Sequence, residues 1–152
     1  RENMSLASLR SASRGGFIDF AAERRLATAM ISQLRIKTPS DQQVVRFLSG
    51  GNQHKVVLAK WLARQPRLLL LDEPTRGIDV GAKAEIYDVL HRLAGEGLAV
   101  LFVSSEMEEI LSLADRGLVM HEGRLAGELA RDQLSEENVM RLAAGAVGRI
   151  SA

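Results

Sequence analysis

The sequence predicts an α/β fold built around a parallel sheet. Three short and largely apolar stretches, residues 68–71, 98–103 and 118–121, alternate with segments whose apolar residues recur every three or four positions. Such runs are typical of strands buried on both faces, and the longer period is that of a helix that packs on one side. Because the connections are short, we expect right-handed crossovers and parallel strands.

Size and composition indicate a single globular domain. The 152 residues are enough for a hydrophobic core, and the 20 Lys and Arg against 19 Asp and Glu give a net charge of +1. This balance argues against a chain that coats nucleic acid or an anionic membrane. The lack of cysteine excludes a disulfide scaffold, a zinc–thiolate site and a cysteine nucleophile. The sequence has no apolar run long enough to span a bilayer and no N-terminal leader peptide, so we expect a soluble, cytoplasmic protein. The initial Arg indicates that the sequence starts inside a longer chain.

Up to about Leu48 the sequence predicts helices and loops without a strand. Asp19 can cap a helix from residue 20 to about 36, since its carboxylate can accept hydrogen bonds from the free N–H groups of the first turn. Residues 37–40 end this helix because they include Pro39, which lacks the backbone donor.

Beyond Ser49, helices and strands alternate. A helix of residues 52–64 precedes the leucines 68–71, which we expect at the centre of the core. Asp79 is predicted to cap the next helix. The remaining predicted elements are a strand (98–103), a helix (107–114), a strand (118–121) that turns at Glu122-Gly123 into a hairpin with residues 124–129, a helix from Ser135 or Asp132 to about 144, and a frayed tail after Gly145.

Two acids, Asp72 and Glu73, follow the leucine run. They would lie at the carboxyl end of a strand, where open α/β sheets bind ligands. A carboxylate there is costly to desolvate unless it is compensated, and Mg²⁺, which binds few carboxylates together with phosphate oxygens, is a fitting partner. The other acid could take a proton from water. Taken alone, the pair is explained equally well as two solvated acids at the end of a strand, without a function.

Ser49, Gly50 and Gly51 come directly before a predicted helix. The open N–H groups at the positive end of a helix form an anion site, and glycine lets the backbone approach a phosphate closely. An ordinary serine N-cap with a glycine turn is the simpler interpretation of this stretch alone.

Together the two features resemble the ATP-binding cassette ATPases. Residues 48–53 (Leu-Ser-Gly-Gly-Asn-Gln) resemble the signature motif, residues 68–73 the Walker B strand, and residues 76–79 (Arg-Gly-Ile-Asp) the D-loop. The sequence of residues 72–83 and 103–106 resembles that of the second cassette in the ATPase subunits of bacterial ribose-, xylose- and arabinose-type importers. The resemblance implies the C-terminal part of a P-loop NTPase domain with a parallel sheet. Residues 1–48 would belong to the helical subdomain that docks on the membrane partner. Residues 49–130 would form the signature helix and the α/β core, and residues 131–152 a C-terminal helix and tail.

The resemblance also implies roles for particular residues. Asp72 would hold Mg²⁺ through water, and Glu73, as the catalytic residue, would orient or deprotonate the attacking water. The signature would reach the γ-phosphate of ATP held by the opposite cassette, and Asp79 would lie at the interface between cassettes. The cofactor-binding residues implied are Ser49, Gly50, Gly51, Asn52, Gln53, Asp79 and Ser105. The implied partners are the other cassette, a membrane permease and, indirectly, a periplasmic sugar-binding protein, at the cytoplasmic face of the membrane and without nucleic acid.

The sequence departs from the family pattern at two places. It contains no Gly-Lys dipeptide and hence no Gly-x-x-x-x-Gly-Lys phosphate loop, so we expect an ABC-type sugar-transporting ATPase that does not bind ATP normally by itself. Ser105 stands where the family usually has histidine, and a hydroxyl can donate a hydrogen bond but cannot carry the imidazolium charge. Hydrolysis at the chain's own site is therefore in question.

Two alternative functions remain. The chain could be a non-catalytic remnant or interaction module that only completes a partner's ATP site. A cassette ATPase that acts on DNA or ribosomes is disfavoured, because the sequence has no coiled coil or basic linker. The resemblance further implies that the strand at 68–71 lies beside a P-loop strand, which this sequence does not contain. Because an unpaired apolar edge pairs with other chains, we expect the isolated chain to self-associate.

Overall fold

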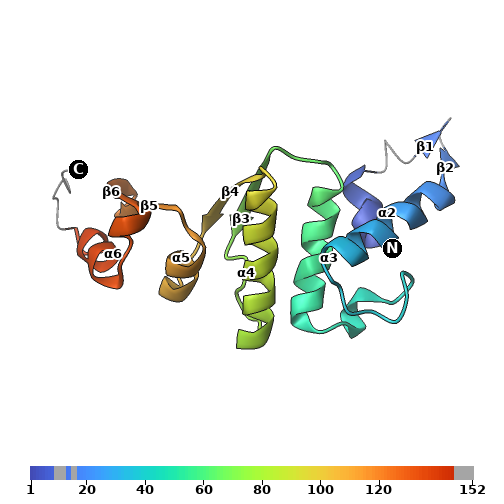
Figure 1. Cartoon of the computed structure of the whole chain (residues 1–152), viewed down its shortest axis with the longest axis horizontal. Coiled ribbons are helices and arrows are strands. Elements are labelled where there is room, and N and C mark those ends of the chain that lie inside the picture. The colour runs from blue at the N-terminus through green and yellow to red at the C-terminus, as the bar shows by residue number, and fades with distance from the viewer. Residues whose placement is uncertain (9–12, 15–16, 146–152) are drawn as a thin grey trace. The chain divides into compact units, whose positions relative to one another are not determined.

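The computed structural model describes residues 1–8, 13–14 and 17–145. The chain divides into two compact units, residues 1–103 and residues 104–152 (Figure 1). No helix of the described residues is both long enough and apolar enough to cross a bilayer.

The first unit begins with helices α1 (Glu2–Ser5) and α2 (Phe20–Gln33). Asp19 caps α2 as predicted, accepting hydrogen bonds from the N–H groups of Ala21 and Ala22 at 3.0 and 2.9 Å. The helix ends before the predicted residue 36, because Arg35 adopts a left-handed backbone with φ 50°. The sequence pattern did not show this turn, since arginine rarely adopts that conformation.

The expectation that the first 48 residues contain no strand is wrong. Strands β1 (Ser13–Arg14) and β2 (Phe17–Ile18) pair antiparallel. Each strand has two residues, which is too short for the two-residue hydrophobic period of a half-buried strand to show in the sequence.

A β-α-β unit follows and forms the α/β part of this unit. Helix α3 (Gly50–Leu62) leads to strand β3 (Leu68–Asp72), helix α4 (Val80–Gly95) and strand β4 (Ala99–Val103). The two strands are parallel, with Leu68 opposite Ala99 and Asp72 opposite Val103, which confirms the α/β class and the parallel sheet. The residues of α4 that are buried are Ile86, Val89, Leu90 and Leu93.

The sheet is not buried on both faces as the leucine run predicts. Leu69 is buried, but the side chains that share the other face are between 50% and 66% exposed, namely Leu68, Leu70, Leu101 and Val103. Burial therefore alternates along both strands, because the described residues of this unit cover one face of the two-stranded sheet and leave the other open. An unbroken apolar run indicates that both faces of a strand can be buried. It does not indicate which segment of a protein covers each face.

The second unit contains α5 (Met107–Leu113), β5 (Arg116–His121), β6 (Arg124–Ala130) and α6 (Glu136–Ala143). Its core is formed by Val119, Leu129, Val139 and Leu142. Ser135 caps α6, accepting from the N–H of Asn138 at 3.2 Å, as predicted. The predicted frayed tail after Gly145 lies outside the described residues.

The hairpin expected between residues 118–121 and 124–129 is confirmed, whereas the expectation that the third strand extends the parallel sheet is not met in the described residues. In the described residues β5 pairs with β6 in an antiparallel hairpin, and the parallel sheet consists of β3 and β4. The hairpin turn at Glu122 and Gly123 was predicted, and both residues have left-handed φ angles of 46° and 75°. Two successive left-handed residues form the tight turn that favours antiparallel pairing of the flanking strands.

Candidate functional site

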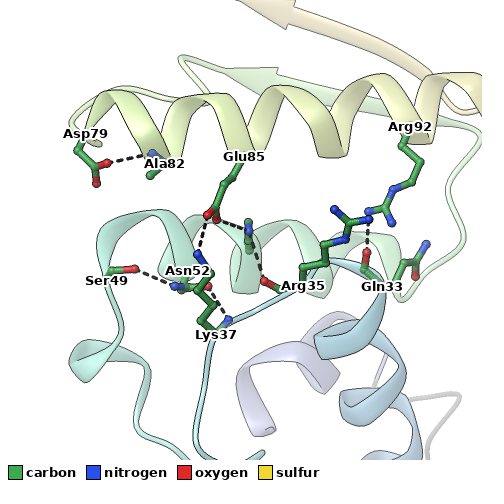
Figure 2. Close-up of polar contacts among 10 residues, drawn as sticks. Gln33, Arg35, Lys37, Ser49, Asn52, Asp79, Ala82, Glu85 and Arg92 are labelled. Carbon is green, nitrogen blue, oxygen red and sulfur yellow. Dashed lines mark hydrogen bonds and ion pairs between the residues drawn. The ribbon is translucent and has the colours of Figure 1, made fainter.

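The first turns of α3 and α4 lie against one another (Figure 2). A Cβ atom on Gly51 would lie 2.6 Å from the Cβ of Ala82, and one on Gly50 would lie 3.4 Å from Cγ2 of Ile78. Gly51 is therefore needed for the close approach of the two helices. The sequence interpretation gave both glycines to the approach of a phosphate, and it missed this packing contact.

Ser49 is the N-cap of α3, yet its hydroxyl makes no capping hydrogen bond. The side chains of Asp19, Asp79 and Ser135 all accept hydrogen bonds from first-turn N–H groups of their helices. In the described residues the first turn of α3 is thus left without a side-chain cap, although it has a suitable residue at the capping position. Ser49 and Gly50, at the start of that turn, are exposed.

Asn52 holds the Ser49 hydroxyl instead. The Nδ2 atom of Asn52 donates to Oγ of Ser49 at 2.8 Å, and Oδ1 of Asn52 accepts from the N–H of Lys37 at 2.8 Å. Asn52 is only 7% exposed. Its neighbour Gln53 donates from Nε2 to the carbonyl of Leu48 at 2.8 Å. Both amides predicted to belong to the site therefore contact the chain around Ser49.

The electrostatic environment of this helix end favours an anion. The first turn of α3 contains no acidic residue, so nothing within the turn offsets the positive end of the helix dipole. The neighbouring turn of α4 is offset by Asp79, whose Oδ1 accepts from the N–H of Ala82 at 2.9 Å. A negative group that approaches Ser49 and Gly50 would meet uncapped N–H donors.

A cluster of three charged residues fixes the neighbouring backbone, and the sequence interpretation missed it. Glu85 of α4 binds Nζ of Lys37 at 2.7 Å and Nζ of Lys55 at 2.8 Å (Figure 2). The Lys55 side chain is 3% exposed, and its Nζ also lies 3.4 Å from the carbonyl of Arg35. The Lys37 and Lys55 ammonium groups lower the pKa of Glu85 to about 2, and Glu85 raises the pKa of Lys37.

These residues line a surface cavity of about 380 Å³ between α3, α4 and the segment after α2. Its lining residues are Leu34, Arg35, Lys37, Lys55, Glu85, Asp88, Val89 and Arg92. At the far end Nη2 of Arg92 donates to the carbonyl of Gln33 at 2.6 Å. The only sequence signal for this cluster was the presence of Lys55 on the buried side of α3.

The acids predicted from the Walker B resemblance lie at the end of β3. Asp72 is its last residue and is exposed, and Glu73 is partly buried. The Glu73 N–H donates to the carbonyl of Val103 at 2.8 Å, while its φ of 47° is left-handed. A left-handed glutamate is a strained conformation of the kind found at functional sites, whereas Asp72 is still paired within β3 opposite Val103.

The described residues contain no group of three or more His, Cys, Asp and Glu side chains that could hold a metal by themselves. Asp72 supplies one exposed carboxylate, which fits Mg²⁺, an ion that is commonly bound by one or two carboxylates, water and phosphate oxygens. Ser105 is exposed and belongs to the second unit, where it follows Ser104, whose Oγ accepts from the N–H of Glu106 at 3.0 Å.

The sequence profile of the family described as "ABC transporter" matches residues 1–76, half of the chain. An ATP-binding protein assigned to ribose, galactose and methyl galactoside import in Pseudomonas fluorescens Pf-5 is 56% identical over 144 residues, which are 95% of this chain and 28% of that protein. The ribose import ATP-binding protein RbsA of Bacillus cereus is 50% identical over 145 residues, 95% of this chain and 29% of that protein. The chain thus spans less than a third of the length of these relatives.

Solved structures share the fold. The MJ1267 ATP-binding cassette of an ABC transporter in its ADP conformation has a TM-score of 0.76 at 21% identity, covering 95% of this chain and 61% of that chain. The dimeric MJ0796 bacterial ABC transporter cassette has a TM-score of 0.70 at 24% identity, covering 86% of this chain and 55% of that chain. The signature and Walker B resemblances thus stand on a matching fold and a matching family profile, and the chain belongs to the ABC transporter family.

Proposed function

We propose that this chain is part of the ATP-binding and hydrolysing subunit that powers monosaccharide import through an ABC transporter. The observation that carries the proposal is the uncapped N-terminus of α3 within the signature sequence, where Ser49 is a capping residue that does not cap. The identity to ribose and galactose import ATP-binding proteins, at 56% and 50%, supports the choice of a sugar as the cargo.

In this proposal the signature acts on a nucleotide held by another cassette. The hydroxyl of Ser49 and the N–H groups of Gly50 and Gly51 donate to the γ-phosphate of that ATP. Asn52 and Gln53 hold the turn in place through their contacts with Ser49 and Leu48. Closure of the two cassettes around ATP is then coupled to the binding of the nucleotide, because the donors meet the phosphate only in the closed state.

The acidic end of β3 serves the chemistry of the chain's own site. Asp72 would hold Mg²⁺ through water, and the ion would supply positive charge for the phosphate oxygens. Glu73 orients the attacking water and takes its proton. Asp79, at the interface between the cassettes, links the two ATP sites. Ser105 donates a hydrogen bond to the γ-phosphate. These tasks are positioning and electrostatic stabilisation, which carry most of the catalysis in phosphoryl transfer.

The proposed partners follow from the same function. A second cassette completes each ATP site, a membrane permease receives the motion, and a periplasmic sugar-binding protein delivers the sugar to the permease. The chain then works on the cytoplasmic side of the membrane, bound to the permease.

A second candidate is a non-catalytic cassette that only completes a partner's ATP site. The Ser105 hydroxyl in the switch position favours it. Both candidates use the signature in the same way, and they differ in whether Glu73 acts on water.

The test is Glu73→Gln in the full gene product that carries this chain, assembled with its permease. We expect ATP turnover to fall at least a hundredfold while Mg-ATP binding is retained, because the amide keeps the shape of the carboxyl and cannot take a proton. The matched control is Glu96→Gln, an exposed glutamate at the end of α4. Unchanged turnover in Glu73→Gln would overturn the catalytic role and leave the non-catalytic cassette.

A further inference from the structure

The orientation of the Asn52 amide is fixed by its partners. The N–H of Lys37 can only donate, so the atom of Asn52 that lies 2.8 Å from it must be the carbonyl oxygen Oδ1. The other atom of the amide is then the NH₂ group, which lies 2.8 Å from Oγ of Ser49. Oγ of Ser49 must therefore accept, because an amide NH₂ cannot.

A consequence follows for the hydroxyl hydrogen of Ser49. A hydroxyl has one hydrogen to donate and two lone pairs that accept. Asn52 occupies one lone pair, so the hydrogen is turned away from Asn52 and remains available to an acceptor. Since Ser49 is exposed and lies at the positive end of α3, an anion at that helix end would receive the hydrogen.

The chain contains an internal comparison for this arrangement. Ser135 and Asn138 have the same spacing and the same helix positions in α6 as Ser49 and Asn52 have in α3. There the Ser135 hydroxyl caps the N–H of Asn138 at 3.2 Å, and Nδ2 of Asn138 donates to the carbonyl of Gln133 at 2.8 Å. The Ser-x-x-Asn spacing thus does not by itself place the asparagine amide on the serine.

The surroundings of Lys37 produce the difference in α3. The backbone after α2 is held at Gln33 by Nη2 of Arg92 and at Arg35 by Lys55, while Glu85 binds the Lys37 side chain (Figure 2). The Lys37 N–H is thereby presented to Asn52, which is 7% exposed and cannot turn its amide without leaving this N–H unsatisfied.

We propose that Asn52 is a positioning residue, which acts through Ser49 by keeping the serine hydroxyl uncapped and its hydrogen directed at the phosphate of ATP. The inference rests on the proposed function, because it takes that phosphate as the acceptor. Asn52 need not touch the nucleotide. Its contribution is to hold the donor in place before ATP arrives, so that less ordering is needed on binding.

The test is a double-mutant cycle between positions 49 and 52, with ATP turnover measured in the full gene product assembled with its permease. Ser49→Ala should lower turnover about tenfold or more, as expected for the loss of a hydrogen bond to a charged group. Asn52→Ala should lower turnover about fivefold in the native background and less than twofold in the Ser49→Ala background. Equal fold-changes in the two backgrounds would overturn the proposal.

A second variant covers the case in which Asn52→Ala is unstable. Asn52→Asp keeps an oxygen for the Lys37 N–H and removes the donor to Ser49, so the melting temperature should change little while turnover falls about fivefold. In the Ser49→Ala background this loss should shrink to the repulsion between the new carboxylate and the phosphate, and a loss of undiminished size there would overturn positioning. The matched control is Asn138→Ala, which should change turnover less than twofold. If Ser49→Ala alone leaves turnover unchanged, the proposed function fails, independently of Asn52.

Discussion

Gly51 and Ala82 define the distance between α3 and α4, since a Cβ at position 51 would lie 2.6 Å from the Cβ of Ala82. Real Cβ atoms do not approach this closely, so any side chain at 51 must separate the helices. The separation would also displace Ser49, two residues away, from the first turn of α4. The glycine is thus a requirement of the fold as well as of the site.

We expect Gly51→Ala to lower the free energy of unfolding by about 1–3 kcal/mol, the usual cost of overpacking a well-packed contact. Ala82→Gly in the same chain should recover most of the loss, less about 1 kcal/mol for glycine in a helix. Urea denaturation of the two variants and of the double variant measures the effect. Gly95→Ala is the control, because nothing lies within 4 Å of a Cβ there. A Gly51→Ala chain as stable as the native one would show that the two helices are free to separate.

The two lysines that bind Glu85 should contribute unequally to the stability of the fold. Glu85→Ala leaves the ammonium of Lys55, whose side chain is 3% exposed, without its carboxylate. Because that carboxylate is itself 41% exposed, we expect a loss of about 1 kcal/mol. Lys37→Met removes a side chain that is 74% exposed and should cost less than Glu85→Ala, because solvent screens an exposed ion pair. Thermal unfolding of both variants at pH 7 makes the comparison. A larger loss for Lys37→Met than for Glu85→Ala would contradict the assignment of Lys55 as the buried partner.

The free energy of unfolding should depend on pH through the ionisation of Glu85. The two lysines lower the pKa of this carboxyl from 4.5 in the unfolded chain to about 2 in the folded one. The unfolded chain therefore binds the proton more readily, so the stabilisation is complete above pH 4.5 and is lost as the pH falls toward 2. Because the carboxylate is 41% exposed, screening by solvent limits this contribution to about 1 kcal/mol.

The measurement is the free energy of unfolding of the native chain and of Glu85→Gln between pH 6 and pH 2.5. The difference between the two should shrink as the pH falls through this range, because the native chain loses its ion pairs and the variant has none to lose. A difference that stays constant would mean that Glu85 is not paired in solution.

The local features of the fold could be read from the sequence. Asp19, Asp79 and Ser135 each cap the helix they were expected to cap, because capping involves only residues two or three positions away. The Glu122-Gly123 turn was equally predictable, since it depends on two adjacent residues that adopt left-handed angles. The candidate site was found because its signature and acidic strand are short continuous motifs.

The features that the sequence did not reveal join distant segments. Lys55 and Glu85 are 30 positions apart, and their contact depends on how α3 packs on α4. The same packing gives Gly51 its role, which no pattern around residue 51 records. The hairpin partner of β5 was predicted, because the turn joins adjacent segments. That β5 does not extend the parallel sheet of β3 and β4 in the described residues was not predicted, because an apolar strand pairs parallel or antiparallel according to the rest of the sheet.

The open face of the β3–β4 sheet has its own physical consequence. In the described residues of the first unit, Leu70 and Leu101 lie opposite one another and are 66% and 54% exposed. Leu68 and Val103 extend the same face. Contiguous apolar surface of this kind favours association, and β3 also has an edge that pairs with no other described strand.

We therefore expect the isolated 152-residue chain to self-associate, with a mass above that of the monomer in light scattering at micromolar concentration. Leu70→Lys should shift the chain toward the monomer, because a charge at the centre of the open face is costly to bury and because lysine on an edge strand opposes further pairing. Leu125→Lys is the matched control, since Leu125 is 58% exposed on β6 in the second unit. A native chain that is a compact monomer, or a Leu125→Lys effect as large as that of Leu70→Lys, would show that this face does not drive association.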